Sequence, residues 1–277
     1  MVPLPPTERH HPDGARLSGL ALEHALSTLH RGDAEAVRAV GRALPALARL
    51  AALAAGSLAA GGRLVYAGAG TSGRLAAMDA AECPPTFGLL PSQVVALVAG
   101  GRRALSRSVE GAEDDREAGR RAVRRARVGP RDLVVGISAS GRTPFTLAAL
   151  AEARARGAAT ALLSSAPPPA AAARHRIVLD TGPERIAGST RMKAGTAARM
   201  ALTLLSTGAM LRLGRIERGR MVDLSAASQK LRRRAVRIVA EVSGASPPRS
   251  RAALLRSGWS VRAALADLRQ RRPGRRG

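Results

Sequence analysis

A turn rich in glycine and hydroxyl residues, followed by a carboxylate, is the part of the sequence best suited to chemistry. Residues 68–74 read Gly-Ala-Gly-Thr-Ser-Gly-Arg and follow a short apolar run, which predicts a buried strand. The next segment has the composition of a helix, and we expect it to end at Glu82, before Pro84 and Pro85. Free backbone N–H groups and the helix dipole make such a turn an anion site. The segment therefore favours chemistry on a small phosphorylated molecule.

A second turn of the same kind follows another predicted strand. Residues 138–144 read Ser-Ala-Ser-Gly-Arg-Thr-Pro, with Pro144 in the first turn of a predicted helix. In a single turn, the serines and the threonine could serve only as helix caps. Two such turns after strands of one sheet favour phosphate binding instead.

The first turn also matches the dinucleotide-binding pattern G-x-G-x-x-G, through Gly68, Gly70 and Gly73. A dinucleotide site requires a carboxylate after the next strand, to bind the ribose. That strand, residues 94–98, runs into Ala-Gly-Gly. The hydroxyl groups of the turn suit a single phosphate better.

Charged residues suggest two further candidates. Residues 108–117 contain five carboxylates, which could be a solvated helix start, although in so basic a chain we expect at least one to face the pocket. Lys193 is one of only two lysines, the other being Lys230, among 45 basic residues. A compact ammonium group could be required at position 193, and a lysine on a helix surface is an equally good interpretation.

Composition excludes several classes of protein. The net charge is +25, but the arginines are scattered along the chain and aromatic residues make up 1%, so a specific nucleic-acid function is not expected. The only cysteine, Cys83, excludes a disulfide framework and a multi-thiolate metal site and fits a reducing cytoplasm. No signal peptide is recognised. Residues 44–60 are apolar but contain Pro45 and Arg49, which indicates a core helix rather than a membrane span.

Short apolar runs alternate with helical stretches in the middle of the chain, which predicts an α/β fold with a five-stranded parallel sheet flanked by helices. The expected strands are residues 64–67, 94–98, 133–137, 160–163 and 177–179. Before them we expect helices 16–30 and 33–60, with Asp33 as an N-cap and a kink or break at Pro45. After them we expect helices 222–243, 247–256 and 259–270. The predicted organisation is a poorly ordered segment 1–14, an α/β domain 15–218 that contains both anion turns, a small helical region 219–270 and a basic tail 271–277.

Several motifs together resemble the N-acetylmuramic acid 6-phosphate etherases, which have a sugar-isomerase (SIS) fold and are related to the glucokinase regulatory protein. The matching segments are residues 68–74, 79–88, 109–114, 138–144 and 188–196, within a resemblance that covers about residues 7–230. The sequence departs from the family pattern near Thr7, where no asparagine follows, at Thr203, and in a shorter, arginine-rich C-terminal region. The resemblance implies a three-layer SIS fold and a homodimer.

The resemblance also implies an activity, cleavage of the D-lactyl ether at C3 of the sugar to give N-acetylglucosamine 6-phosphate and D-lactate. Two family glutamates fall on Glu82, as the acid toward the lactyl oxygen, and Glu113, as the base at C2. One carboxyl must be protonated and the other ionised near neutral pH, and no metal or other cofactor is needed. The residues predicted to bind the substrate and its phosphate are Gly70, Thr71, Ser72, Gly73, Ser138, Ser140, Gly141, Arg142, Thr143 and Lys193.

Two alternatives share this fold. One is a non-catalytic sensor of sugar phosphates like the glucokinase regulatory protein, and the other is a sugar-phosphate isomerase. The retained Glu82 and a length with room for one SIS unit argue against the sensor. An isomerase would need a base but no acid at the C3 ether.

Overall fold

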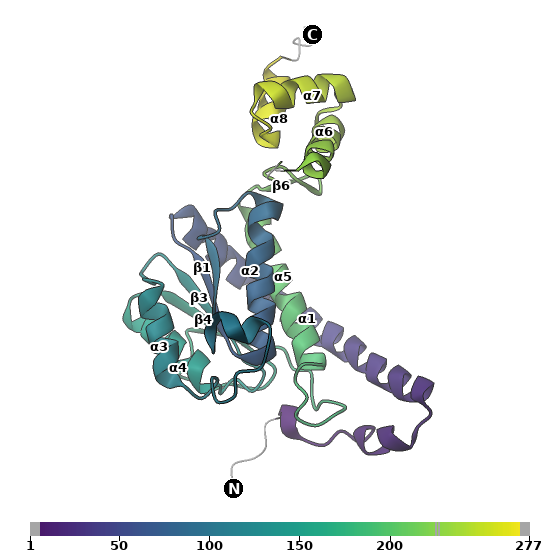
Figure 1. Ribbon diagram of the computed structural model, residues 1–277, viewed down its shortest axis with the longest axis vertical. Helices are drawn as coiled ribbons and strands as arrows, with labels where there is room; N and C mark the ends of the chain where they lie inside the picture. The colour runs from purple at the N-terminus through teal and green to yellow at the C-terminus, as the bar shows by residue number, and fades with distance from the viewer. Residues whose placement is uncertain (1–5, 225, 227, 272–277) are drawn as a thin grey trace. The chain divides into compact units, whose positions relative to one another are not determined.

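The predicted parallel sheet is present in the computed structural model, which describes residues 6–224, 226 and 228–271 (Figure 1). Its strands are β1 (Leu64–Gly68), β2 (Val94–Val98), β3 (Leu133–Ile137), β4 (Ala159–Ser164) and β5 (His175–Val178). All pairs are parallel, in the order β2-β1-β3-β4-β5. Gly68 is level with Val98 on one side and Ile137 on the other, so these strands end at one edge. The expected fold class and all five expected strands are confirmed.

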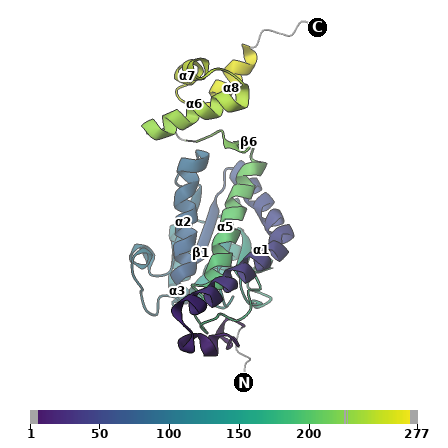
Figure 2. The ribbon, with the colours of Figure 1, turned by 90° about the vertical axis from the view of Figure 1, so that its right-hand side faces the viewer.

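Helices cover both faces of the sheet, which explains why its strands are continuous apolar runs. The flanking helices are α1 (Leu22–Ala59), α2 (Gly70–Phe87), α3 (Arg116–Arg125), α4 (Pro144–Ala155) and α5 (Lys193–Arg212). Helices α3 and α4 lie on one face, where Val123 and Leu150 pack with Val65 and Val134 of the strands. Helices α1, α2 and α5 lie on the other face, as the two ribbon views show (Figures 1 and 2).

The N-terminal helix differs from the prediction. In place of two helices, residues 14–19 form a 3₁₀ helix and α1 runs unbroken from Leu22 to Ala59. Asp33 is therefore inside α1 and is not an N-cap, and Pro45 does not break the helix. A stripe of small and apolar residues that includes Ala43 and Leu47 is buried on both sides of Pro45, and this burial offsets the lost backbone hydrogen bond. By length and composition α1 could cross a membrane, but its buried stripe is that of a core helix.

Helix α2 also continues beyond its predicted end. It includes Pro84 and Pro85 and ends at Phe87, where the amide of Gly88 donates to the carbonyl oxygen of Pro84 (2.9 Å). The prolines fall in the last turn, so only the final hydrogen bonds of the helix lose their donors. Glu82 is therefore within α2.

The described residues divide into two compact units. The first, which we call the sheet unit, contains the described residues up to Ala81 and Ser92–Ala209. The second, the helical unit, contains Glu82–Pro91 and the described residues from Met210 onward. Its elements are β6 (Ile216–Glu217), β7 (Arg220–Met221), α6 (Gln229–Ser243), α7 (Pro247–Arg256) and α8 (Val261–Gln270).

The three predicted C-terminal helices are present. The first of them begins at Gln229 rather than at residue 222, and a short hairpin precedes it. The helices pack around a core that includes Val239, Leu254 and Leu265. Residues 1–5 and 272–277, the outer parts of the predicted poorly ordered segment and basic tail, lie outside the described residues. Thr7, within the segment expected to be poorly ordered, is fully buried.

A buried ion pair lies at the edge of the sheet where the strands begin, and it joins the residues that precede two neighbouring strands. Arg63 precedes β1, Asp132 precedes β3, and Arg63 Nη2 donates to Asp132 Oδ2 at 2.7 Å. The same carboxylate accepts hydrogen bonds from the amides of Arg63 (2.9 Å) and Gly129 (3.0 Å). Burial alone would raise the pKa of Asp132, but these hydrogen bonds outweigh burial and hold the pKa below its usual value.

We expect Asp132→Asn to lower the free energy of unfolding by about 1.5–3 kcal/mol, because a buried charged acceptor loses its charge. Because folding lowers the pKa of Asp132, its stabilisation is present at neutral pH and is lost as the pH falls through the pKa of the folded state. The difference between the two proteins should therefore shrink in acid. Denaturant unfolding at several pH values measures it, with Asp180→Asn at an exposed carboxylate as the control. An unchanged midpoint in Asp132→Asn would contradict this account.

Candidate functional site

The first turn of α2 lies directly against the end of β1. A Cβ atom at Gly73 would be 2.7 Å from the carbonyl oxygen of Gly68 and 2.8 Å from Cγ1 of Val98, so only glycine fits there. Gly70 has a φ of +53°, which lets the chain reverse between strand and helix. The amides of this first turn have no earlier carbonyl in the helix to bond, and they lie at the edge where the strands end.

The second predicted turn places three hydroxyl groups at the start of α4. Ser138 Oγ lies 2.8 Å from Thr143 Oγ1 and 3.4 Å from Ser140 Oγ. Gly141 has a φ of +69°, and a Cβ atom there would lie 2.9 Å from Cβ of Pro168. The turn therefore requires glycine at this position, and it precedes α4 without a linker.

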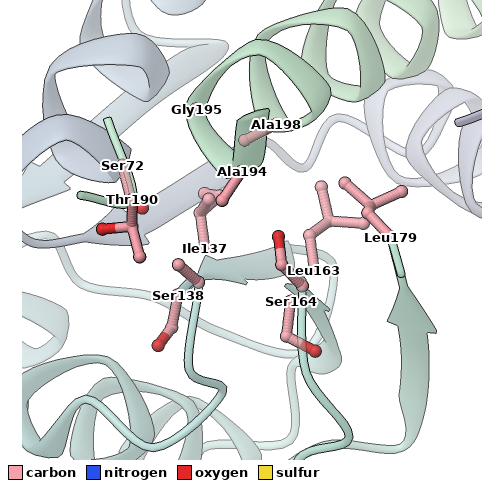
Figure 3. A pocket seen from close by; sticks show the side chains of 12 residues that line it. Ser72, Ile137, Ser138, Leu163, Ser164, Leu179, Thr190, Ala194, Gly195 and Ala198 are labelled. Atoms are coloured by element: carbon pink, nitrogen blue, oxygen red, sulfur yellow. The ribbon is translucent and has the colours of Figure 1, made fainter. Parts of the chain in front are cut away.

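A narrow pocket, which we call the serine pocket, lies at the ends of the strands (Figure 3). Ser72 of α2, Ser138 after β3 and Ser164 of β4 line it, and Thr190 and the first turns of α5 contribute the rest of its wall. Its cavity volume is about 10 Å³, which is about the space of one water molecule. It can accommodate a single polar group such as a phosphoryl oxygen.

A wider pocket, which we call the Glu113 pocket, lies on the other side of the α2 start. Its lining includes Gly70, Ala104 and residues 108–113, and its cavity volume is about 150 Å³. Gly70 lines this pocket and Ser72 lines the serine pocket, so the first turn of α2 borders both. A sugar phosphate could therefore place its phosphate and its carbon chain on either side of this turn.

The backbone of Glu113 is held by α4. The amide of Phe145, in the first turn of α4, donates to the carbonyl oxygen of Glu113 at 2.9 Å. The Glu113 side chain is exposed, and within the described part of the chain no hydrogen bond or ion pair engages its carboxylate. The turn of hydroxyl groups and the loop of Glu113 are thus fixed by the same helix.

The other carboxylates of the acidic cluster have structural partners, with the exception of Asp114. Glu110 accepts a hydrogen bond from Ser108 (2.7 Å). Asp115 caps α3 by accepting the amide of Ala118 (2.7 Å), and Glu117 pairs with arginines on α3. The interpretation as a helix start therefore applies to Asp115 and Glu117. Glu110 and Glu113 both line the Glu113 pocket, and Glu110 is bonded to Ser108 whereas the Glu113 carboxylate has no partner among the described residues.

Two predicted site residues lie elsewhere. Glu82 is an exposed residue of α2 and belongs to the helical unit. Lys193 is not among the residues that line the serine pocket, because its ammonium is buried against Glu35 (2.5 Å) and the carbonyl oxygen of Thr181 (2.8 Å). Neither of our interpretations of Lys193, a phosphate ligand or a lysine on a helix surface, matches this position.

The remaining predicted residues lie near the first two turns. Thr71 faces α5, since a Cβ atom at Gly195 would be 3.5 Å from its Cγ2. Arg142 is exposed, and its amide donates to Ser140 Oγ at 3.2 Å. Ser164 and Thr190 also line the serine pocket and were not predicted as site residues. Ser164 follows the rule that ligands bind where parallel strands end, and Thr190 lies in the segment 188–196 that matches the family.

Two protein-family models match the chain. The model of the glucokinase regulatory protein N-terminal SIS domain matches residues 47–154, and the SIS domain model matches residues 117–208. Both matches fall on the segments that form the sheet and the two pockets.

Curated relatives match almost the whole chain. An N-acetylmuramic acid 6-phosphate etherase of Deinococcus radiodurans is 47% identical over 265 residues, covering 95% of this chain and 87% of the relative. Etherases of the same name from Gloeobacter violaceus and Serratia proteamaculans are 47% and 43% identical over 261 residues, covering 94% of this chain and 85% and 88% of the relatives.

Solved structures share the fold at low identity. A phosphoheptose isomerase from Francisella tularensis has a TM-score of 0.51 and 15% identity, covering 69% of this chain and 100% of that chain. An Escherichia coli CFT073 protein in complex with A5P has a TM-score of 0.51 and 18% identity, and the match covers 74% of this chain and 97% of that chain. At this identity the likeness concerns the fold alone.

We expect Gly141→Ala to weaken binding of inorganic phosphate, because the added methyl group collides with Pro168 and displaces the hydroxyl turn. Gly182→Ala is the matched control, since Gly182 has a φ of +63° but a Cβ atom there would meet nothing within 4 Å. In both variants the free energy of unfolding should fall by about 1–2 kcal/mol, because alanine must adopt the left-handed conformation. Thermal unfolding with and without phosphate measures both effects. Equal stabilisation of the two variants by phosphate would exclude this turn as the anion site.

Proposed function

This chain belongs to the N-acetylmuramic acid 6-phosphate etherase family, and we propose that it cleaves the D-lactyl ether at C3 of that sugar phosphate. The products are N-acetylglucosamine 6-phosphate and D-lactate, so the chain acts as a carbon–oxygen lyase. The observation that carries the proposal is the 47% identity to an etherase of this name over 95% of the chain. The two adjoining pockets, one lined by hydroxyl groups and one by Glu113, support it.

The phosphate binds in this proposal where the start of α2 and the hydroxyl turn before α4 meet the serine pocket. Ser72, Ser138, Ser140 and Thr143 supply hydroxyl donors, and the amides at the start of α2 supply backbone donors. The glycines at positions 70, 73 and 141 allow close approach of the backbone. Thr71 and Arg142 lie in the same two turns, next to these residues. Lys193 is left out of it, because its ammonium is buried against Glu35.

Elimination and hydration follow from the chemistry of the open-chain sugar. The C1 aldehyde acidifies the proton at C2, and the Glu113 carboxylate removes that proton. The bond between C3 and the lactyl oxygen then breaks while a carboxylic acid, assigned to Glu82 on the family resemblance, protonates the leaving oxygen, which releases D-lactate and leaves a C2–C3 double bond. Water adds its hydroxyl group to C3 and a proton returns to C2. Acid, base and aldehyde supply the polarisation that this route requires.

Location and assembly are part of the same proposal. We place the protein in the cytoplasm, where its buried thiol, Cys83, stays reduced. A homodimer is proposed from the family resemblance. The ligand is a small sugar phosphate, and the proposal includes neither a membrane nor a specific nucleic acid.

Glu82→Gln and Glu113→Gln should each lower the rate of D-lactate release by about a hundredfold or more, because each removes a proton-transfer group. The assay is release of D-lactate from N-acetylmuramic acid 6-phosphate by the purified protein. Glu110→Gln is the matched control, because Glu110 belongs to the same loop but is bonded to Ser108. Full activity in both variants would exclude this mechanism.

Solvent deuterium separates the two roles. The base variant Glu113→Gln should lose exchange of the C2 proton, whereas the acid variant Glu82→Gln should keep exchange and lose only lactate release. The reverse result would exchange the two assignments. If the wild-type protein binds the sugar phosphate but releases no lactate, a sensor function replaces the enzyme.

A further inference from the structure

A cluster of one half-buried carboxylate and two buried cations lies beside the segment that carries Thr190 of the serine pocket. Glu35 of α1 contacts two cations at once, with its Oε2 2.5 Å from Lys193 Nζ and its Oε1 2.5 Å from Arg185 Nη2. The side chains of Lys193 and Arg185 are 3% and 5% exposed. We call Glu35, Arg185 and Lys193 the Glu35 clamp. Within the described residues, Glu35 is the carboxylate that neutralises both cations at hydrogen-bond distance.

The two cations of the clamp stand at the two ends of one segment. Arg185 lies in the middle of the connection between β5 and α5, and Lys193, the first residue of α5, ends the segment 185–193. Between them, Thr190 lines the serine pocket, and directly after Lys193, Ala194 and Gly195 form its wall. A single carboxylate on α1 therefore ties both ends of the segment that shapes this wall.

A second carboxylate fills the N-terminus of α5. Glu184 is fully buried and accepts the amides of Lys193 (3.1 Å) and Ala194 (2.9 Å). Burial raises the pKa of Glu184, and these two hydrogen bonds oppose the rise. Because the first amides of α5 bind this side chain, the start of α5 is already occupied, and the start of α2 is the one that borders the serine pocket through Ser72.

Close packing prevents the clamp from moving. A Cβ atom at Gly32, one turn before Glu35, would lie 3.1 Å from Cδ of Lys193. A Cβ atom at Gly14 would lie 2.3 Å from the carbonyl oxygen of Arg185. The amide of Gly188 donates to the carbonyl oxygen of Thr7 at 3.1 Å. The N-terminal segment and α1 thus enclose the loop from outside.

We propose that Glu35 is a positioning residue for the sugar-phosphate site, which fixes the wall formed by Thr190, Ala194 and Gly195 through Lys193 and Arg185. The proposal rests on the proposed function, because it takes the serine pocket as part of the site that binds the sugar phosphate. Glu35 touches neither substrate nor reacting atoms in this role. It acts on affinity by holding the pocket in its binding shape.

The test compares Glu35→Gln with Asp132→Asn in the full-length protein. Both variants remove the charge of a carboxylate that pairs with arginine or lysine, buried at Asp132 and half-buried at Glu35. Asp132 lies where the strands begin, whereas Glu35 holds two cations of the segment that forms the pocket wall. Removing one partner of a buried pair destabilises a protein strongly, so both variants should unfold at lower temperature. A purely structural role for Glu35 predicts that nothing else changes.

The decisive readout is the affinity for N-acetylglucosamine 6-phosphate, the product in the proposed function, which has no lactyl ether to cleave. We expect Glu35→Gln to raise its Kd about tenfold, equal to about 1.4 kcal/mol. Asp132→Asn should leave the Kd within about twofold, which is less than 0.5 kcal/mol on the same scale. With N-acetylmuramic acid 6-phosphate, Glu35→Gln should raise KM more than it lowers kcat, because it disturbs binding rather than proton transfer.

Gly32→Ala provides a second test that keeps every charge. Its methyl group would press on the stem of Lys193, so we expect a smaller rise in Kd with the ion pairs retained. Gly41→Ala in the same helix is the control, since a Cβ atom there would meet nothing within 4 Å. If Glu35→Gln does not fold, the Kd values of Gly32→Ala and Gly41→Ala test the positioning role in its place.

An unchanged Kd in Glu35→Gln and in Gly32→Ala, with a wild-type protein that binds the sugar phosphate, would overturn the positioning role. That result differs from failure of the proposed function, in which the wild-type protein releases no D-lactate. The Kd comparison remains valid in that case, since it requires binding and no catalysis.

Discussion

The arrangement of both pockets depends on how closely the first turn of α2 approaches the end of β1. At Gly73 the separation leaves no room for a side chain between the backbone of Gly68 and the side chain of Val98. Gly68 is held level with Val98 and Ile137 by in-register parallel pairing, so the sheet cannot yield locally. Any larger residue at position 73 would push α2 outward. Ser72 and Gly70, which line the two pockets, would move with it.

Helix α4 joins the two chemical parts of the proposed site. Its first residue follows the turn of Ser138 and Thr143, and its Phe145 amide holds the backbone of Glu113. Helix α3, which follows Glu113, packs so closely on α4 that a Cβ atom at Gly119 would lie 2.3 Å from the carbonyl oxygen of Phe145. The proposed base and the proposed phosphate contacts therefore share one rigid support. Such sharing suits a reaction in which the phosphate orients the carbon chain for proton transfer.

The sheet could be predicted from sequence because its strands are buried on both faces and so appear as uninterrupted apolar runs. The pocket turns could be predicted because their backbone conformations restrict the residue types, as at Gly141. The effect of prolines on helix ends could not be predicted from sequence, because the local tendency of proline to end a helix competes with the burial of the helix's apolar face. Pro45 lies in a helix whose stripe is buried on both sides, and Pro84 and Pro85 lie in the last turn of α2.

Lys193 shows where reasoning from residue types stops. Its rarity in a chain that uses arginine almost everywhere indicated a position that requires lysine. The structure shows such a requirement, because the ammonium donates to Glu35 and to the carbonyl oxygen of Thr181, and the aliphatic stem packs against Gly32. The partner, however, lies 158 residues away in the sequence. A buried ion pair and a phosphate ligand make the same demand for a compact cation, so residue type alone cannot separate them. The separation comes from which surface the cation faces, and that is a property of the packed α1, loop and α5 together.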